Sequence, residues 1–360
     1  MHLWFDISFH GYGHLSQAAE VINTCALQHP DLRLTVKCAA PRAVLTRRIR
    51  VPFIHIQSAS DVTMAMVSAV EVDADASARG YQAFHRDWAR HVADYAALLR
   101  HAAPDVVLAN VAYLPLAAAK HAGIPAAGLC SLNWADIYAH YCGGRPEAAE
   151  ILGEMRAAYA GAECFIRLEP AMPMYDLPNR VAVGPVAQYG QSQRAHIYRQ
   201  LGLNPDEKLV LVNMGGMHFR PPMESWPRLP GVTWLVQQDW RVQHADAHAF
   251  EPLGMAFTDL LASCDAVIGK PGYGLFTEAA VNEVPLLYLR RVDWPEEPYL
   301  VDWLVRNGRC LEVSAAAIAS GELASGLAGL WAQPSPPPVR SNGAQQVVKI
   351  IAGMLQNPAV

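Results

Sequence analysis

Short apolar runs alternate along the chain with longer segments in which apolar residues recur every three or four positions. The short runs are typical of buried strands, and the periodic segments are typical of amphipathic helices. In the first half of the chain, this pattern predicts strands at residues 3–9, 32–36, 53–56, 106–109, 126–130, 163–168 and 181–183. It predicts helices there at residues 15–27, 42–48, 81–100 and 114–121.

The same alternation starts again after Gly184, Pro185 and Val186, which mark a boundary. In the second half it predicts strands at residues 209–213, 232–236, 266–268 and 285–289. The predicted helices are at residues 196–201, 257–262, 275–281 and 297–307. A proline cluster at 334–338 then precedes an amphipathic helix at 344–355.

This repeated order of strand and helix predicts an α/β protein with two doubly wound, Rossmann-like domains that face a cleft. We assign the first domain to residues 1–185, the second to 186–340, and a C-terminal helix and tail to 341–360. A length of 360 residues fits two domains. The C-terminal helix is expected to pack back on the first domain.

Composition narrows the class of protein. Apolar residues make up 52% of the chain and charged residues 17%, which is enough to fill two cores. The net charge of -5, with no basic cluster, argues against nucleic acid as a partner. The start of the chain lacks the features of a signal peptide, and no apolar run is long enough for an integral membrane segment. Seven widely spaced cysteines without a C-x-x-C pair indicate reduced thiols, so we expect a cytoplasmic protein.

Residues 58–78 show no clear period, and we expect a long loop there. Asp73 and Asp75 form a D-x-D sequence within it. Because the surrounding pattern is not that of a metal-binding sheet edge, we interpret the two carboxylates as solvated.

Each half carries a glycine loop between a strand and a helix. In the first loop, Gly11 and Gly13 allow a tight turn and a close approach of a ligand to the backbone. His10 and His14 lie in the same loop, and a neutral histidine there is a candidate proton acceptor. A phosphate contact or a purely structural role for these histidines is an equal alternative.

The second loop follows residues 266–268. Gly272 and Gly274 precede a helix whose free N–H groups would cradle a diphosphate. Lys270 adds positive charge, and Tyr273 lies between the two glycines. Gly215 and Gly216 follow another strand of the same half, where they either approach the phosphates or form a tight turn.

Six stretches of the chain resemble one family. The sequence is similar to the glycosyltransferase-like domain at the N-terminus of plant L-arabinokinase and to its stand-alone bacterial relatives. More distantly, it resembles the N-acetylglucosaminyltransferase of peptidoglycan synthesis and glycosyltransferase family 28. The matching stretches are residues 10–14, 133–138, 165–168, 213–216, 269–274 and 290–298.

The resemblance implies a GT-B fold and a transferase that moves a sugar from a nucleotide donor, UDP-linked, to a small acceptor. It implies that Glu278, six residues after Gly272, binds the ribose hydroxyls, and that Glu296 or Glu297 binds the donor sugar. Lys270 stands where retaining relatives carry a glutamate, which favours an inverting reaction. His14 matches a loop histidine near the acceptor or the phosphates. The relatives need no metal, so we expect no cofactor and no metal.

We expect Asn133, Trp134, Asp136 and Tyr138 to end a strand of the first half, on the acceptor side. Aromatic and amide groups together are common in sugar sites, although Trp134 could equally pack in the core. Asp136 is the alternative base to the two histidines.

Two other functions remain open: a sugar-nucleotide epimerase and a non-catalytic module that binds sugar nucleotides. The related plant protein carries a sugar-kinase domain after this region, and no kinase phosphate loop is visible here, so kinase activity is not expected. Fold alone does not decide among these functions, and the sequence does not predict an oligomeric state.

Overall fold

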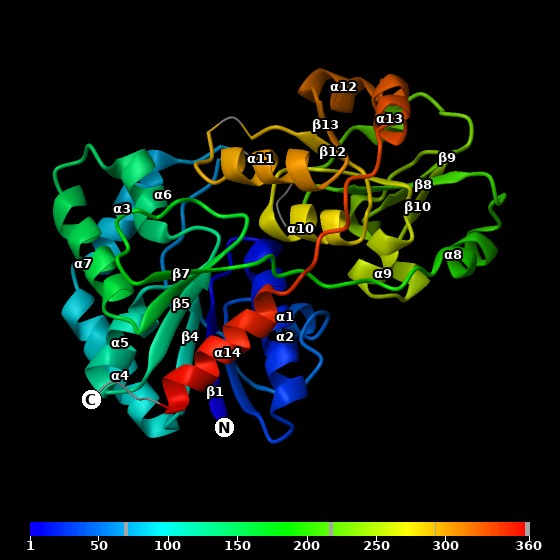
Figure 1. Cartoon of the computed structure of the whole chain (residues 1–360). Coiled ribbons are helices and arrows are strands. Elements are labelled where there is room, and N and C mark those ends of the chain that lie inside the picture. Colours follow the sequence, from blue (N-terminus) through cyan, green and yellow to red (C-terminus); the bar gives the residue numbers. More distant parts are fainter. Residues whose placement is uncertain (68–70, 216–218, 292, 357–360) are drawn as a thin grey trace. The chain divides into compact units, whose positions relative to one another are not determined.

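The computed structural model of the chain describes residues 1–67, 71–215, 219–291 and 293–356. The chain divides into two compact units (Figure 1). The first unit contains Met1–Val67, Glu71–Val186 and the chain from Ser341 onward, and the second contains Ala187–Arg340. Each unit has its own parallel sheet with helices around it.

The sheet of the first unit has the order β3-β2-β1-β4-β5-β6-β7, and its neighbouring strands are all parallel. Its strands in the described part of the chain are β1 (His2–Ile7), β2 (Arg33–Lys37), β3 (Ile54–Ile56), β4 (Val106–Asn110), β5 (Ala126–Cys130), β6 (Cys164–Leu168) and β7 (Arg180–Val183). The direction of winding changes between β1 and β4. Ligands of doubly wound sheets bind beyond the carboxyl ends of the strands at such a point.

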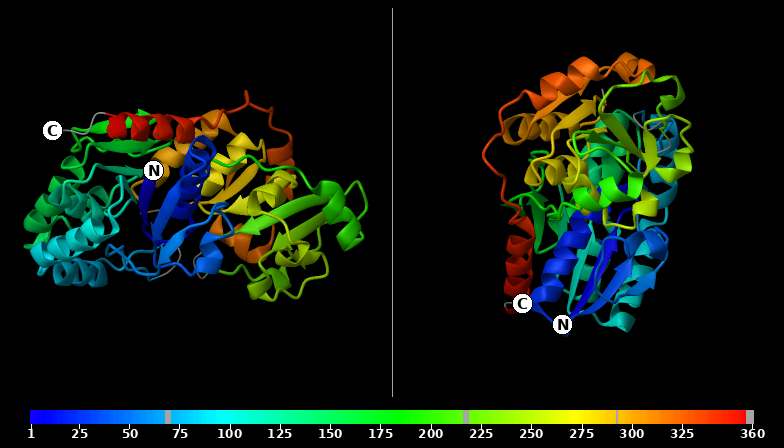
Figure 2. Two further views of the ribbon diagram at one scale, coloured as in Figure 1. Left: turned by 90° about the horizontal axis from the view of Figure 1, so that it is seen from below. Right: turned by 90° about the vertical axis from the view of Figure 1, so that its right-hand side faces the viewer.

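The helices described in the first unit are α1 (Tyr12–Gln28), α2 (Arg42–Leu45), α3 (Ala74–His85), α4 (Trp88–Ala102), α5 (Leu114–Ala122), α6 (Trp134–Cys142), α7 (Ala148–Ala160) and α14 (Gly343–Gln356). Helix α14 lies beside α1, as the red and blue helices show in Figures 1 and 2. Its buried face holds Val347, Val348 and Ile351. The predicted packing of the C-terminal helix on the first domain is therefore confirmed.

The sheet of the second unit has the order β10-β9-β8-β11-β12-β13, and it too is parallel throughout. Its described strands are β8 (Lys208–Asn213), β9 (Val232–Val236), β10 (Ala247–Ala249), β11 (Ala266–Gly269), β12 (Leu286–Leu289) and β13 (Cys310–Val313). The α-helices are α8 (Arg194–Leu201), α9 (Phe257–Ala262), α10 (Tyr273–Val281), α11 (Glu297–Asn307), α12 (Ala315–Ser320) and α13 (Ala324–Trp331). The change of winding lies between β8 and β11.

The central strands of each sheet are apolar and almost continuously buried, as expected for parallel sheets covered on both faces. In β4, for example, all five residues are buried. The seven cysteines, all within the described ranges, are buried and unlinked, which confirms the expectation of free thiols. Among the described helices, none is long and apolar enough to cross a membrane.

Three sequence predictions about elements were wrong. The loop predicted at 58–78 ends early, because Asp73 caps α3 by accepting a hydrogen bond of 2.8 Å from the backbone N–H of Ala76. The single helix predicted at 81–100 is two helices, α3 and α4, that break at residues 86–87. Residues 133–138 do not end a strand: β5 ends at Cys130, and Asn133 caps the start of α6.

Candidate functional site

In the second unit, polar and charged groups gather at the carboxyl ends of β8, β11 and β12. Gly215 follows β8 and has a φ of 77°, a backbone conformation that favours glycine. A Cβ atom there would lie 3.1 Å from Cε of Lys270, which follows β11. Glycine at position 215 therefore leaves room for the side chain of Lys270. Gly216 was predicted to act beside it and lies outside the described residues.

Helix α10 starts directly after Lys270 and Pro271. Gly272 is its N-cap residue and accepts a 3.0 Å hydrogen bond from the N–H of Phe276, but it has no side chain to cap the first N–H groups. Tyr273 and Gly274 form the first turn. This end of the helix carries a partial positive charge and favours an anion.

Lys270 is the centre of positive charge in this site. Burial, together with the positive charge of Arg291, lowers the pKa of Lys270 to about 8, and the negative charge of Glu296 partly opposes this. The guanidinium of Arg291 lies 3.9 Å above the ring of Trp294. The indole N–H of Trp294 in turn donates to Glu296 over 3.1 Å. The segment after β12 thus brings an arginine, an aromatic ring and a carboxylate close to the lysine.

The two adjacent glutamates at the start of α11 have different environments. Glu297 is 1% exposed, and it accepts hydrogen bonds from the backbone N–H of Arg291 (2.7 Å) and from Nε of Arg290 (3.2 Å). It therefore holds the segment after β12 in place. Glu296 is the one that interacts electrostatically with Lys270. Glu278, on the second turn of α10, is 1% exposed and is not a solvated helix glutamate.

In the first unit, the candidate residues meet at the ends of β1, β4 and β5. The turn from β1 into α1 requires glycine at position 11, which has a φ of 106°. It continues through Gly13 into the first turn of α1, where His14 is buried. The backbone N–H of Ser8, which follows β1, donates to the carbonyl of Asn110 at the end of β4 over 2.7 Å. These residues therefore lie at the point where the winding of the sheet changes.

A chain of neutral side chains orients His14. Its Nδ1 lies 2.8 Å from the amide oxygen of Asn110. The amide nitrogen of Asn110 donates to Gln17 (2.8 Å), whose amide nitrogen donates to Ser131 (2.9 Å). This network assigns the ring proton to Nδ1 and leaves Nε2 as the basic atom. Burial lowers the pKa of His14 to about 4, although the bond to Asn110 partly opposes that effect.

Trp134 contacts both histidines and also a carboxylate that the sequence did not indicate. Its ring centroid is 5.5 Å from that of His10 and 5.7 Å from that of His14. Its indole N–H donates to Oδ2 of Asp61 over 2.8 Å. The hydroxyl of Ser8 donates to the same oxygen. Trp134 is fully buried, so it packs in the core while its N–H group orients Asp61.

The other residues predicted on the acceptor side belong to α6. The side chain of Asn133 accepts from the N–H of Asp136, and its amide donates to Oδ2 of Asp136 over 2.9 Å. Asp136 is thus part of a helix cap. Burial raises the pKa of Asp136. Tyr138 is fully buried, and its ring centroid lies 4.7 Å from that of Tyr81.

Sequence reasoning missed Asp61 and Asn110 as members of these sites. For Arg291 it left a phosphate contact and a surface salt bridge equally open, and the structure buries this residue. Asn110 could have been found, since it directly follows an apolar run that ends a predicted strand. Asp61 lies in a segment without periodicity, and only the folded chain brings it to Ser8, 53 positions away.

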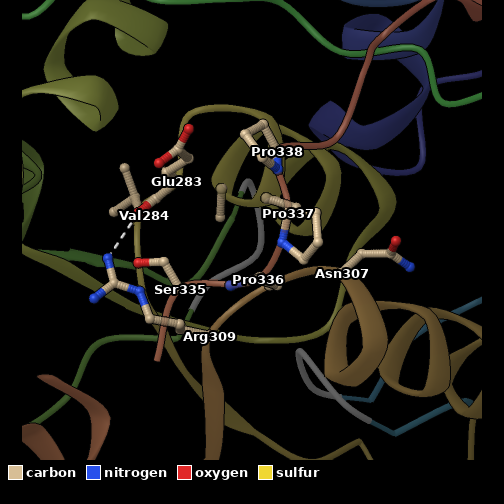
Figure 3. Close-up of a pocket in the computed structure, with 11 residues that line it drawn as sticks. Glu283, Val284, Asn307, Arg309, Ser335, Pro336, Pro337 and Pro338 are labelled. Atoms are coloured by element: carbon tan, nitrogen blue, oxygen red, sulfur yellow. Dashed lines mark hydrogen bonds between the residues drawn. The ribbon is translucent and has the colours of Figure 1, made fainter. Parts of the chain in front are cut away.

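A hollow in the surface of the second unit lies elsewhere. It is lined by residues of the C-terminal part of α10 and by the proline segment Ser335–Pro338 (Figure 3). In it, the guanidinium of Arg309 donates to the carbonyl of Glu283 over 3.0 Å. Because it lies at the opposite end of α10 from Gly272, this hollow is not the lysine and glycine site.

Comparison with solved structures identifies the fold. The calicheamicin glycosyltransferase CalG4 matches with a TM-score of 0.64 and 15% identity, over 100% of this chain and 99% of that chain. A UDP-N-acetylglucosamine 2-epimerase matches with a TM-score of 0.58 and 13% identity, over 100% of this chain and 98% of that chain. The two Rossmann-like units therefore form a GT-B fold, as the sequence predicted.

Comparison of sequences supports the predicted resemblance. No protein-family model matches the chain. The L-arabinokinase of Arabidopsis thaliana is 26% identical over 304 residues, which are 83% of this chain and 29% of that protein. The chain therefore spans less than a third of the length of this relative.

Proposed function

We propose that the protein is a glycosyltransferase that moves a sugar from a nucleoside diphosphate donor, UDP-linked, to the hydroxyl group of a small acceptor. The observation that carries this proposal is the group of Lys270, Arg291 and the uncapped start of α10 at the carboxyl edge of the second sheet. Together they offer two cations and a helix N-terminus to a diphosphate. We infer that the second unit binds the donor and the first unit the acceptor.

Donor recognition follows from the same groups. Glu278 accepts hydrogen bonds from the vicinal ribose hydroxyls, because a carboxylate suits two neighbouring donors. Glu296 binds hydroxyls of the donor sugar, whereas Glu297 is committed to Arg290 and Arg291. The GT-B fold shared with CalG4 and with a UDP-N-acetylglucosamine 2-epimerase supports a sugar nucleotide as the ligand.

The reaction we propose is a single displacement with inversion and without a metal. Lys270 occupies the place where retaining relatives have a glutamate, so no second carboxylate is supplied at this position. The leaving diphosphate develops negative charge, which Lys270 and the N–H groups of α10 stabilise in a buried setting. His10, His14 and Asp136 are the sequence candidates for the proton acceptor. Of these, Asp136 serves the cap of α6.

The first test measures heat unfolding of the parent protein and of Glu278→Ala with a panel of nucleotides and sugar nucleotides. We expect one diphosphate sugar to stabilise the parent by several degrees and the variant by much less. Glu322→Ala, an exposed position of the same unit, is the matched control and should respond like the parent. A panel without any stabilising ligand would contradict the donor site.

A second measurement separates the alternatives. The selected donor is incubated with the parent and with a series of monosaccharide acceptors, and both the sugar and the nucleotide are followed by NMR. Release of nucleoside diphosphate that depends on an acceptor identifies a transferase. Conversion of the sugar without an acceptor identifies an epimerase, and binding without any conversion identifies a binding module.

A further inference from the structure

His14 is a weak proton acceptor in this fold, although the sequence favours it. Its Nδ1–H group faces the neutral amide of Asn110, and that amide is held in turn by Gln17. A histidine that takes up a proton gains from a carboxylate at its other ring nitrogen, because the negative charge stabilises the imidazolium. No carboxylate occupies that place among the described residues that contact His14.

A carboxylate does contact Trp134, the residue whose ring lies beside this histidine. Asp61 comes from the segment after β3, is partly exposed, and directs Oδ2 toward the indole N–H of Trp134 and the hydroxyl of Ser8. Its other oxygen, Oδ1, accepts no hydrogen bond from any group in the described parts of the chain. Asp61 thus has one oxygen held by Ser8 and Trp134 and a second one that makes no such bond.

The fold places this carboxylate where an acceptor would bind. Ser8 follows β1 directly, and its N–H bonds to the end of β4. Trp134 follows β5 closely. Both donors to Asp61 therefore come from the carboxyl edge of the sheet, at the change of winding where doubly wound folds bind ligands.

We propose that Asp61 takes the proton from the acceptor hydroxyl, while neutral His14 accepts a hydrogen bond from a neighbouring hydroxyl of the same acceptor through Nε2. This assignment rests on the proposed transferase function. The O–H bond of the acceptor breaks, and its proton passes to Oδ1 of Asp61. The acceptor oxygen bonds to the anomeric carbon, whose bond to the diphosphate oxygen breaks, and that electron pair leaves with the nucleoside diphosphate.

The electrostatics of the site agree with this role. Burial raises the pKa of Asp61 to about 6, against the hydrogen bonds from Ser8 and Trp134. The negative charge of Asp6 on β1 raises the pKa of Asp61 further, and the ammonium of Lys37 on β2 lowers it. The tyrosines that interact electrostatically with Asp61 are Tyr81, Tyr113 and Tyr159. A base with a pKa near the working pH is more effective than His14, with its pKa of about 4.

The test compares kcat for release of nucleoside diphosphate by the parent, Asp61→Asn and Asp31→Asn, the last an exposed control. The donor is the one selected by heat unfolding, and the acceptors are water and a series of monosaccharides. We expect kcat of Asp61→Asn to fall about 100-fold or more, with the dissociation constant of the donor unchanged. Asp31→Asn should match the parent in both quantities.

A pH profile provides the second measurement and does not depend on the folding of Asp61→Asn. In the parent, kcat/KM should fall on the acid side near pH 6, because only the ionised carboxylate accepts a proton. Ser8→Ala removes a hydrogen bond to that ionised form, so its acid limb should move to higher pH. A threefold change or less in Asp61→Asn, or an acid limb near pH 4 that Ser8→Ala does not move, would overturn the role of Asp61.

Failure of the proposed function has a different signature. A parent protein that binds no sugar nucleotide, or that converts the sugar without releasing nucleoside diphosphate, contradicts the transferase itself and the role of Asp61 with it. A parent that binds and transfers, while Asp61→Asn retains full kcat, contradicts the role of Asp61 alone.

Discussion

At the scale of single residues, each unit has an ionisable candidate residue whose pKa is shifted toward neutral pH. Lys270 keeps a proton that its surroundings disfavour, since burial and Arg291 both lower the pKa of its ammonium. Asp61 keeps a proton more readily than an exposed aspartate, since burial raises the pKa of its carboxyl group. Both groups therefore change protonation state closer to neutral pH than exposed lysines and aspartates do.

The lowered pKa of Lys270 predicts that donor binding depends on pH. A pKa of about 8 means that the ammonium is present at pH 7 and is largely lost at pH 9. Because the ammonium attracts the diphosphate and the neutral amine does not, we expect donor affinity to fall about tenfold between these pH values. Calorimetric titration with the selected sugar nucleotide at both pH values measures this.

Lys270→Met provides the matching variant. It lacks the charge at every pH, so its donor affinity at pH 7 should be about 10- to 100-fold lower than that of the parent, in line with a lost charge-assisted hydrogen bond. The affinity of the variant should also hardly change between pH 7 and 9. Lys349→Met, at an exposed position of α14, should keep the pH dependence of the parent. If the donor affinity of Lys270→Met falls between pH 7 and 9 as much as that of the parent, the pH dependence comes from another group.

The sequence predicted a site residue when its neighbours in the site are also its neighbours along the chain. Gly272, Lys270 and Glu278 belong to one continuous strand, loop and helix, so their spacing along the chain already describes their arrangement. Asp61, by contrast, reaches its site through the order of strands in the first sheet. That order follows from tertiary packing, which one sequence does not specify residue by residue.

At the scale of elements, the acids Asp73 and Asp75 have different roles at the start of α3. Asp73 caps α3, whereas Asp75 is paired with Arg145 on the surface. Replacing a helix N-cap by alanine costs about 1 kcal/mol, since one N–H group loses its partner. We therefore expect Asp73→Ala to lower the free energy of unfolding by about 1 kcal/mol.

Asp75→Ala is the control for this prediction, because it removes an acid two positions away without removing the cap. Exposed ion pairs contribute little to stability, so we expect no measurable change. Urea unfolding of both variants, followed by tryptophan fluorescence, gives the comparison. Equal loss of stability in the two variants would contradict the assignment of Asp73 as the cap.

The sequence pattern missed the strands β10 and β13, the break between α3 and α4, and the helices α6, α7, α12 and α13, of which α7 has 13 residues. Strands β10 and β13 have three and four residues, too few for a pattern to stand out. The break between α3 and α4 preserves the spacing of apolar positions, so periodicity continues across it. His85 and Trp88 stack across this break, with ring centroids 5.3 Å apart. Long segments such as α1 and α11 were predicted well because one apolar face repeats over several turns.

At the scale of the whole molecule, the chain ends in a helix that belongs to the first unit. After the second unit closes at Arg340, the backbone N–H of Gly343 donates to the carbonyl of Pro185 over 3.0 Å. The side chain of Gln346 accepts from the N–H of Gly184 over 2.7 Å. The first unit therefore includes α14, and the described residues of the second unit lie between β7 and that helix. We therefore expect a substitution that destabilises the first unit to leave ligand binding by the second unit nearly unchanged.

Ile351→Ala tests this separation, because Ile351 is 1% exposed and lies in α14. Loss of a buried isoleucine side chain costs about 2–5 kcal/mol, so hydrogen exchange should rise in α1 and α14. The donor affinity should stay within about twofold of the parent, since Lys270, Glu278 and the start of α10 belong to the other unit. Lys349→Ala, exposed on the same helix, should leave both quantities unchanged. A large loss of donor affinity in Ile351→Ala would mean that the donor site depends on the first unit, and that the division of roles between the two units is wrong.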